Sequence, residues 1–427
     1  MSEVVLNTGD TAWMLMSCAL VLLMTPGLAL FYGGMVRAKG VLNMMMMSFI
    51  SMGIVSILWV LYGYSMAFGK DLGSGLLGDP LEMFGLSAQI APDSFFGTIP
   101  TSVFVAFQAM FAVITVALIS GAIADRAKFG GWILFVIIWS TLVYFPVAHW
   151  VFDFDSGESD PGGWIANQLK AIDFAGGTAV HINAGIAALA AALVLGKRSG
   201  FGREGFKPHN LTLVMIGAGL LWFGWFGFNA GSAVASNATA GITFLNTFVA
   251  TGAAMLGWLV VEKIRDGRAT SLGAASGVVA GLVAITPSCS SVNPLGAIAL
   301  GAIAGALCAL AVGLKYKFGY DDSLDVVGVH LVGGLAGSIL VGVFATSDAP
   351  AGVNGLLFGG GFDQLNRQVI ASVAVLAYSF IVTFLIAKII DKTIGFRISP
   401  EAEAKGIDLS EHAESAYELG GTRGGAF

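Results

Sequence analysis

Charged residues are scarce in this sequence of 427 residues. Asp, Glu, Lys and Arg make up only 11% of it, whereas 56% of the residues are hydrophobic. About a quarter of the residues are charged in a soluble globular chain, so the composition excludes an ordinary water-soluble fold and makes lipid the expected solvent. The net charge of −6 is small for this length. It argues against a nucleic-acid partner, which would need a concentrated basic surface.

Cysteine is also scarce. The three cysteines, Cys18, Cys289 and Cys308, lie in or beside apolar stretches without paired spacing. This pattern indicates neither a disulfide framework nor a zinc site. The sequence also offers no nucleophile with its base, no metal-ligand set and no phosphate-binding loop. We therefore expect no metal, no cofactor and no enzymatic activity.

Long apolar runs are abundant, and they predict an all-α integral membrane protein with eleven transmembrane helices. A span needs roughly 20 apolar residues, because each helical residue rises by about 1.5 Å. The predicted spans are 12–34, 43–68, 98–123, 131–151 and 174–195, followed after a polar stretch by 211–231, 243–262, 271–286, 295–314, 326–345 and 367–390. Acids but no Lys or Arg precede the first run, so we expect a retained helix and not a signal peptide.

Lysine and arginine fall on alternate loops, which predicts the orientation because positive loops stay in the cytoplasm. One set of loops carries Arg37, Lys39, Arg126, Lys128, Lys197, Arg198, Arg203, Lys207, Lys263, Arg265, Arg268, Lys315 and Lys317. The opposite set carries only Lys70, Lys170 and Arg367. We therefore expect the N-terminus outside and the tail from Asp391 inside a prokaryotic inner membrane.

Glycine is frequent, with 59 residues that lie mostly inside the predicted spans. Small residues let transmembrane helices approach closely. A bundle packed this tightly is not expected to enclose a wide aqueous pore. Any conduit should therefore be narrow and suit a small substrate.

Two histidines lie inside predicted spans, where an ionisable side chain is costly and indicates function. His181 and His330 are in the fifth and tenth spans, and Asp173 and Asp325 precede them at the span starts. Matching positions favour an inverted repeat with a site near the midplane. Eight helical residues would carry His181 about 12 Å beyond Asp173. The alternative is that each imidazole only hydrogen-bonds a neighbouring helix.

The other three histidines lie elsewhere. His149 falls at a span end, His209 in a loop and His412 in the tail. We expect them to be structural or solvated.

Five strings of the sequence resemble the ammonium transporter family, Amt branch of bacterial type, along nearly the whole chain. They are Pro-Gly-Leu-Ala-Leu-Phe-Tyr-Gly-Gly at 26–34, the strings at 106–111, 173–183 and 224–232, and Asp-Val-Val-Gly-Val-His at 325–330. The resemblance implies a homotrimer with one narrow conduit in each subunit. It implies a transmembrane domain over 1–390, with two inverted five-helix repeats (about 12–195 and 211–345), an eleventh helix at about 367–390, and a cytoplasmic regulatory tail at 391–427.

The resemblance also implies a path for ammonium. An outer vestibule would hold the cation with the Ser232 hydroxyl and the Phe107 ring. Phe111 and Phe228 would form a gate, and His181 and His330 would line the pore. A cation gains roughly 0.5 to 2 kcal/mol from an aromatic face. Phe107 and Phe111 share a helix face by their i, i+4 spacing, although core packing alone would also explain them.

The sequence departs from the family near the vestibule. Many members place a tryptophan just after the histidine that matches His149, where this chain has Phe152, followed by an acidic insertion at 153–160. Either Trp150 or Trp164 folds back to supply the ring, or the site is weaker, because phenylalanine binds cations less well. Asp173 would favour the cation electrostatically or would cap its helix.

The expected function is ammonium transport. A bare cation is costly in apolar surroundings, so ammonium would lose a proton and ammonia would pass the two histidines, which can relay the proton. Net ammonium uptake is the preferred hypothesis, a passive ammonia channel or an ammonium sensor is the alternative, and methylammonium remains a possible substrate. A sensor would normally carry a signalling domain, whereas this tail ends about 35 residues after the last span. The tail resembles the segment near which cytoplasmic PII signalling proteins bind in this family.

Overall fold

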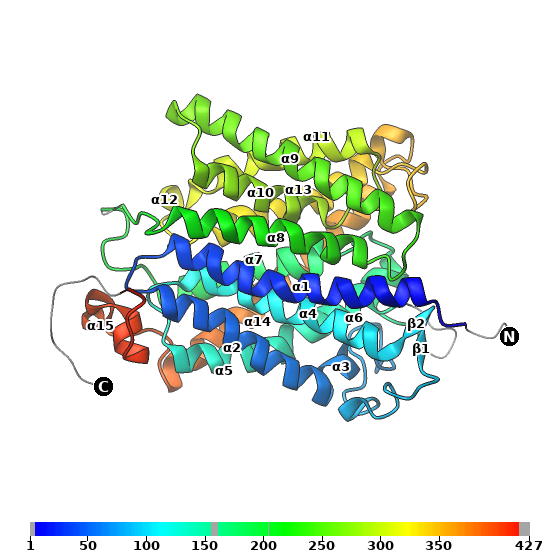
Figure 1. Cartoon of the computed structure of the whole chain (residues 1–427), viewed down its shortest axis with the longest axis horizontal. Coiled ribbons are helices and arrows are strands. Elements are labelled where there is room, and N and C mark those ends of the chain that lie inside the picture. The colour runs from blue at the N-terminus through cyan, green and yellow to red at the C-terminus, as the bar shows by residue number, and fades with distance from the viewer. Residues whose placement is uncertain (1–4, 155–160, 204, 418–427) are drawn as a thin grey trace.

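The computed structural model describes residues 5–154, 161–203 and 205–417. Most of its long helices run roughly along the longest axis of the molecule, side by side in one bundle (Figure 1). Within the described residues the single sheet is a hairpin of β1 (Phe95–Phe96) and β2 (Ile99–Pro100). The predicted all-α class is therefore confirmed.

The helices follow the order of the apolar runs. In the first half they are α1 (Thr8–Met35), α2 (Val41–Leu58) continued by η1 (Trp59–Gly63) and α3 (Tyr64–Phe68), α4 (Thr101–Ile119) with η3 (Ser120–Ile123), α5 (Phe129–Trp139) with η4 (Ser140–Tyr144) and α6 (Phe145–Phe152), and η6 (Gly177–Ile182) with α7 (Asn183–Leu195). In the second half they are α8 (Leu211–Gly231), α9 (Ala238–Asp266), α10 (Ser271–Ile285), α11 (Pro294–Ala311) with α12 (Leu314–Phe318), η7 (Val327–Leu331) with α13 (Val332–Phe344), and α14 (Asp363–Thr393). The short elements are η2 (Phe84–Leu86), η5 (Ile165–Leu169), η8 (Leu356–Phe358), α15 (Pro400–Lys405) and η9 (Asp408–His412).

Ten helices in the described part of the chain are long and apolar enough to cross a membrane, by length and composition. The run predicted at 271–286 forms α10, which is apolar but has only 15 residues. Some helices extend beyond their apolar runs. The longest extension is in α9, where the Asn237 side chain accepts a hydrogen bond from the Ala240 N–H and the left-handed Gly267 ends the helix. These caps, and not hydrophobicity, set its bounds.

The two ends of the bundle differ. We call the end that carries the β1–β2 hairpin and the start of α1 the hairpin end, and the end that carries α15 the tail end (Figure 1). At the tail end, Arg198 lies buried and pairs with Asp321 at 2.8 Å. Arg126 is completely buried and donates to the Asp321 carbonyl and the Ser323 hydroxyl.

The halves of the chain meet where α1 packs along α8. Glycines make this contact possible. A Cβ atom at Gly34 would lie 2.7 Å from the Asn210 carbonyl oxygen, and one at Gly217 would lie 2.7 Å from the Gly27 carbonyl oxygen. Real Cβ atoms do not approach so closely, so larger residues would push the two helices apart.

The segment after α14 docks on the tail end of its own chain. Both oxygens of the Asp408 carboxylate accept backbone hydrogen bonds at the start of α2, from Leu42 at 3.1 Å and Asn43 at 2.8 Å. Glu411 accepts a bond from the Phe129 N–H at the start of α5. These carboxylates satisfy N–H groups that have no partner within their helices.

Candidate functional site

Two histidines from distant parts of the chain meet in the middle of the bundle. The Nδ1 atoms of His181 and His330 lie 3.3 Å apart, and their rings are nearly parallel, 23° between planes. Each histidine lies in a π-helical segment, His181 in η6 and His330 in η7. Such segments are rare and are frequent at functional sites.

The start of η6 corrects one prediction. We expected continuous helix from Asp173 to carry His181 about 12 Å inward, which is wrong because the helix begins at Gly177. The preceding residue, Gly176, has a φ of 119°, which glycine adopts without strain. His181 therefore lies close to the start of a helix that begins inside the bundle.

Asp173 caps this helix start. One carboxylate oxygen accepts from the N–H groups of Gly176 and Gly177, at 2.7 and 2.6 Å. The other accepts from the N–H groups of Thr178 and Ala179 and from the Thr178 hydroxyl. Asp173 has thus the capping role considered above.

The matching cap in the second half is Asp322, and not Asp325, the aspartate noted at the start of that span in the sequence. Asp322 accepts from the N–H groups of Val326 and Val327 at the start of η7. It lies eight residues before His330, the same separation as between Asp173 and His181. Asp325 has a φ of 65° and instead pairs with Lys315 at 2.7 Å.

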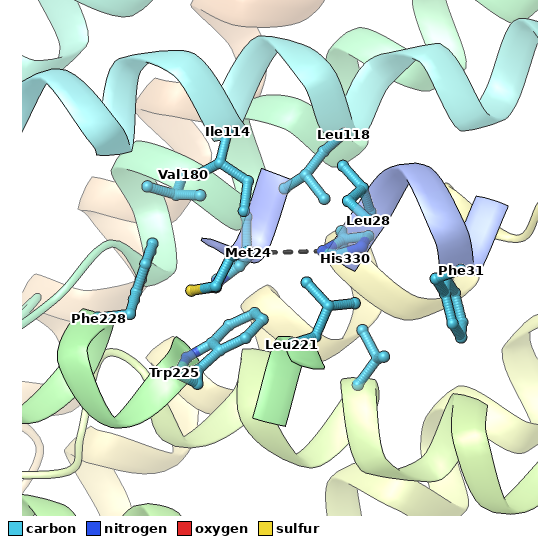
Figure 2. Close-up of a pocket in the computed structure, with 12 residues that line it drawn as sticks. Met24, Leu28, Phe31, Ile114, Leu118, Val180, Leu221, Trp225, Phe228 and His330 are labelled. Carbon is cyan, nitrogen blue, oxygen red and sulfur yellow. Dashed lines mark hydrogen bonds between the residues drawn. The ribbon is translucent and has the colours of Figure 1, made fainter. Parts of the chain in front are cut away.

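The histidine pair lines a small cavity that is apolar on nearly every side (Figure 2). Its other walls come from Met24, Leu28, Phe31, Ile114, Leu118, Val180, Leu221, Trp225, Phe228 and Val279. The space open to the centre of a water-sized molecule amounts to about 10 Å³, roughly what one such molecule needs. Only a small solute could pass, one molecule at a time.

A stacked pair of phenylalanines separates this cavity from the hairpin end. Phe111 and Phe228 have ring centroids 4.2 Å apart, and Phe107 meets Phe111 edge-on at 4.9 Å. Phe228 lines the histidine cavity and Phe111 lines a recess on the other side. All three rings are buried, and the stacked pair lies between the histidine cavity and the recess.

The recess at the hairpin end brings together four of the predicted vestibule and gate residues. Its walls are Phe96, Phe104, Phe107, Gln108, Phe111, Phe152, Phe154, Phe174, Ser232 and Val234. Seven of these ten residues are phenylalanines, whose faces attract cations. The Ser232 hydroxyl donates to the Phe228 carbonyl at 2.8 Å, which leaves its oxygen able to accept a hydrogen bond.

The remaining predicted residues lie elsewhere. Trp150 donates its indole N–H to the Leu76 carbonyl and packs against Tyr378 and Trp164. Phe152, and neither tryptophan, is in the wall formed by the described residues. Asp173 lines a second recess, which shares Phe154 and Phe174 with the first. Most of the acidic insertion, residues 155–160, lies outside the described residues.

Sequence reasoning did not select Trp225, although it lies in one of the family strings. Its ring stacks on His181, with centroids 5.4 Å apart and 15° between planes, and it contacts Phe228. Gln108 was missed as well. Gln108 directly follows Phe107 in the chain, but nothing in the sequence shows which face of this helix lines the recess.

The other histidines have local partners. His149 is buried between Asp71 and Asp153, each 3.3 Å away. His209 contacts the Tyr417 hydroxyl, and His412 contacts the Asn43 side chain. Among the described residues, no group of three or more His, Cys, Asp or Glu side chains could hold a metal ion.

A bundle of membrane-length helices around a small apolar cavity indicates a multi-pass membrane protein. The Ammonium Transporter Family matches residues 12–417. The chain is 62% identical to an ammonium transporter of Mycobacterium tuberculosis, covering 96% of this chain and 90% of the relative. It is 48% identical to an ammonium transporter of Bacillus subtilis, covering 97% and 99%.

Solved structures agree. The fold matches Mep2 of Candida albicans with a TM-score of 0.85 and 33% identity, over 97% of this chain and 94% of that one. It matches a protein described as a sensor Amt protein with a TM-score of 0.86 and 30% identity, over 95% and 98%. The chain belongs to the ammonium transporter family, and its function is ammonium transport. The resemblance seen in the sequence is thereby confirmed.

Proposed function

We propose that ammonium is recruited in the phenylalanine-lined recess, gives its proton to the Nε2 atom of His181, and crosses the histidine cavity as ammonia with its charge restored on the far side. One observation carries this mechanism: the two imidazoles share a hydrogen bond inside a cavity that is otherwise apolar and sized for one small molecule. Such a cavity excludes a hydrated ion, because stripping a charge of its water there is costly.

Recruitment would use the ring faces of Phe107 and Phe152 together with the Ser232 oxygen. Ammonium has four N–H donors, so it can hydrogen-bond to Ser232 while it contacts aromatic faces. With Trp150 and Trp164 packed elsewhere, this site relies on Phe152. Asp173 would contribute mainly by holding η6 in place, because five donors already engage its carboxylate.

The gate would open by movement of the Phe111 and Phe228 rings. The neutral ammonia molecule could then enter the histidine cavity without the cost of burying a charge.

The histidine pair would carry the proton. In the neutral pair one Nδ1 bears hydrogen and donates to the other. If His181 is the donor, its Nε2, buried without a partner, can accept a proton while its Nδ1 hydrogen passes to His330. His330 then releases the hydrogen from its own Nε2. Both imidazoles are left in the opposite tautomers. They must return to their original tautomers before the next proton crosses.

The wider architecture follows the same proposal. Residues 271–286 would make an eleventh crossing, shorter than the others, within two inverted five-helix repeats. The hairpin end would face outward and the tail end the cytoplasm of a bacterial inner membrane, in keeping with the positive loops. The protein would be a homotrimer and would catalyse no chemical conversion of its substrate.

The docked tail, residues 394–417, would offer a surface for a cytoplasmic PII signalling protein. It lies beside the starts of α2 and α5, so a partner bound there would contact both tail and transmembrane domain. The purified transporter can be mixed with the PII protein of its own cell. Failure to co-purify under every nucleotide condition would rule this partner out.

The transport mode is tested by an ammonium pulse on proteoliposomes that hold the wild-type protein. Our proposal predicts a transient inward positive current. Internal alkalinisation without current would identify a passive ammonia channel, and binding with neither signal would identify a sensor. Methylammonium in the same assay shows whether a larger cation is accepted.

A further inference from the structure

A buried hydrogen-bond chain holds the indole that lies against the histidine pair. Trp225 lies in the wall of the histidine cavity (Figure 2). It is 2% exposed, and its ring is stacked nearly parallel to the His181 ring. Its indole N–H donates to the Thr286 hydroxyl oxygen at 2.8 Å. Thr286 lies just after α10 and is completely buried.

The chain continues behind the cavity. The Thr286 hydroxyl donates its single hydrogen to the Leu282 carbonyl at 2.8 Å or to the Asn229 amide oxygen at 3.2 Å. Asn229 donates in turn to the Thr247 hydroxyl at 3.0 Å. Thr286 is therefore the acceptor that the indole needs, and its own position is fixed from α8, α9 and α10.

Few hydrogen bonds hold the His181 ring. Its Nδ1 is shared with His330, and its Nε2 is buried without a hydrogen-bond partner. Packing against the rings of Trp225, Phe228 and His330 limits rotation of the imidazole, and the Trp225 ring is the most nearly parallel of the three. The orientation of the Trp225 indole is therefore one of the restraints that set where the Nε2 atom points in the cavity.

We infer that Thr286 is a positioning residue for transport, which acts on the histidine pair through Trp225. The inference rests on the proposed function of that pair. Without the Thr286 hydroxyl, the buried indole N–H would lack an acceptor, and such a group rotates toward another partner if one is in reach. The cavity beside it offers only about 10 Å³ to a water-sized molecule, so even a small rotation would obstruct the path.

The test compares Thr286→Val, which keeps the shape and removes the hydroxyl, with Thr286→Ser, which keeps the hydroxyl. The control is Thr251→Val. Thr251 is equally buried, but its hydroxyl bonds only to the Thr247 carbonyl of its own helix. We expect Thr286→Val to lower the ammonium-evoked current at least about tenfold, since small misplacements at such sites cost this much or more. Thr286→Ser and Thr251→Val should stay within about twofold of wild type, a spread typical of changes that spare the site.

A double-mutant cycle separates positioning from general destabilisation. In a Trp225→Phe background the N–H is gone, so adding Thr286→Val should change the current no further. A full additional loss would overturn the inference, as would wild-type current in Thr286→Val alone.

A cryo-EM structure of Thr286→Val gives a readout independent of transport. We expect the 15° stacking on His181 to be lost, and an unmoved indole would refute the positioning role even if the wild-type protein carried no current. Absence of any ammonium-evoked signal in wild type would instead overturn the proposed function.

Discussion

His181 and His330 are separated by 149 positions in the chain, yet their Nδ1 atoms lie 3.3 Å apart. Each lies on a helix that starts inside the bundle, and the start of each helix is capped by an aspartate that lies eight residues before the histidine. Each half thus contributes a capped helix start with a histidine to the same site, as expected for a site at the interface of structural repeats. Four further predictions concern the recess, the helix caps, the tail-end ion pair and the docked tail.

Phe152→Trp should strengthen ammonium recruitment. Phe152 lines the recess, and tryptophan is a better partner for a cation than phenylalanine. We expect the half-saturating ammonium concentration to fall by about threefold, which corresponds to roughly 0.6 kcal/mol. Titration of the ammonium-evoked current measures it. Phe223→Trp, at a position that is 58% exposed on α8, serves as the control, and equal effects of both changes would contradict a role for Phe152.

Asp173→Ala and Asp322→Ala should both destabilise the protein through loss of a helix cap. A cap contributes about 0.5 to 2 kcal/mol, and Asp173 should lie at the upper end because it accepts from more donors. Thermal unfolding in detergent measures the loss. If Asp173 also attracts ammonium, only Asp173→Ala will raise the half-saturating concentration. Identical half-saturation in the two variants would restrict Asp173 to capping.

The ion pair of Arg198 and Asp321 should make stability depend on acid pH. Burial alone would raise the pKa of Asp321, but the hydrogen bonds and charges of Arg198 and Arg126 outweigh burial and hold the pKa below its ordinary value of 3.8. The pair therefore stabilises the folded protein fully above about pH 4, and this contribution is lost as the pH falls through the lowered pKa.

Asp321→Asn should reveal this dependence. At pH 7 it should cost up to about 3 kcal/mol, because buried Arg198 loses the carboxylate that accepts its hydrogen bonds and keeps only Asp125, 3.7 Å away. The difference in unfolding temperature from wild type should shrink as the pH is lowered below 4. A difference that stays constant from pH 7 to pH 3 would show that the carboxylate charge is not responsible.

Asp408→Ala should loosen the docked tail. It removes the acceptor for the Leu42 and Asn43 N–H groups, so we expect faster hydrogen exchange at the start of α2 and in residues 400–412. The exposed Glu414 provides a control with the same change in charge. Unchanged exchange in Asp408→Ala, or equal acceleration in Glu414→Ala, would contradict this docking.

Much of the fold could be predicted from the sequence, because hydrophobicity over a span is a long and redundant signal. The histidines stood out for the same reason, since ionisable residues are rare in apolar runs. The helix starts could not be predicted. Asp322 and Asp325 lie only three residues apart, and the backbone turn at Asp325, with its φ of 65°, determines which one caps η7.

The orientation and the partners of the remaining site residues could not be predicted from the sequence either. Trp150 and Trp164 were reasonable candidates for the vestibule, but side-chain direction depends on loop packing that no periodicity reports. Trp225 and Thr286 are separated by 61 positions, and a hydrogen bond over that distance leaves no pattern in one sequence. Residues that act through a neighbour are therefore the ones that only the structure reveals.

The central claim is that the histidine pair carries the proton of ammonium. The most direct measurement is the ammonium-evoked current of His181→Ala and His330→Ala in proteoliposomes, with His209→Ala, outside the cavity, as the control. Our account predicts loss of the current in both cavity variants and its retention in the control. Wild-type current in either cavity variant would show that the charge crosses by another route.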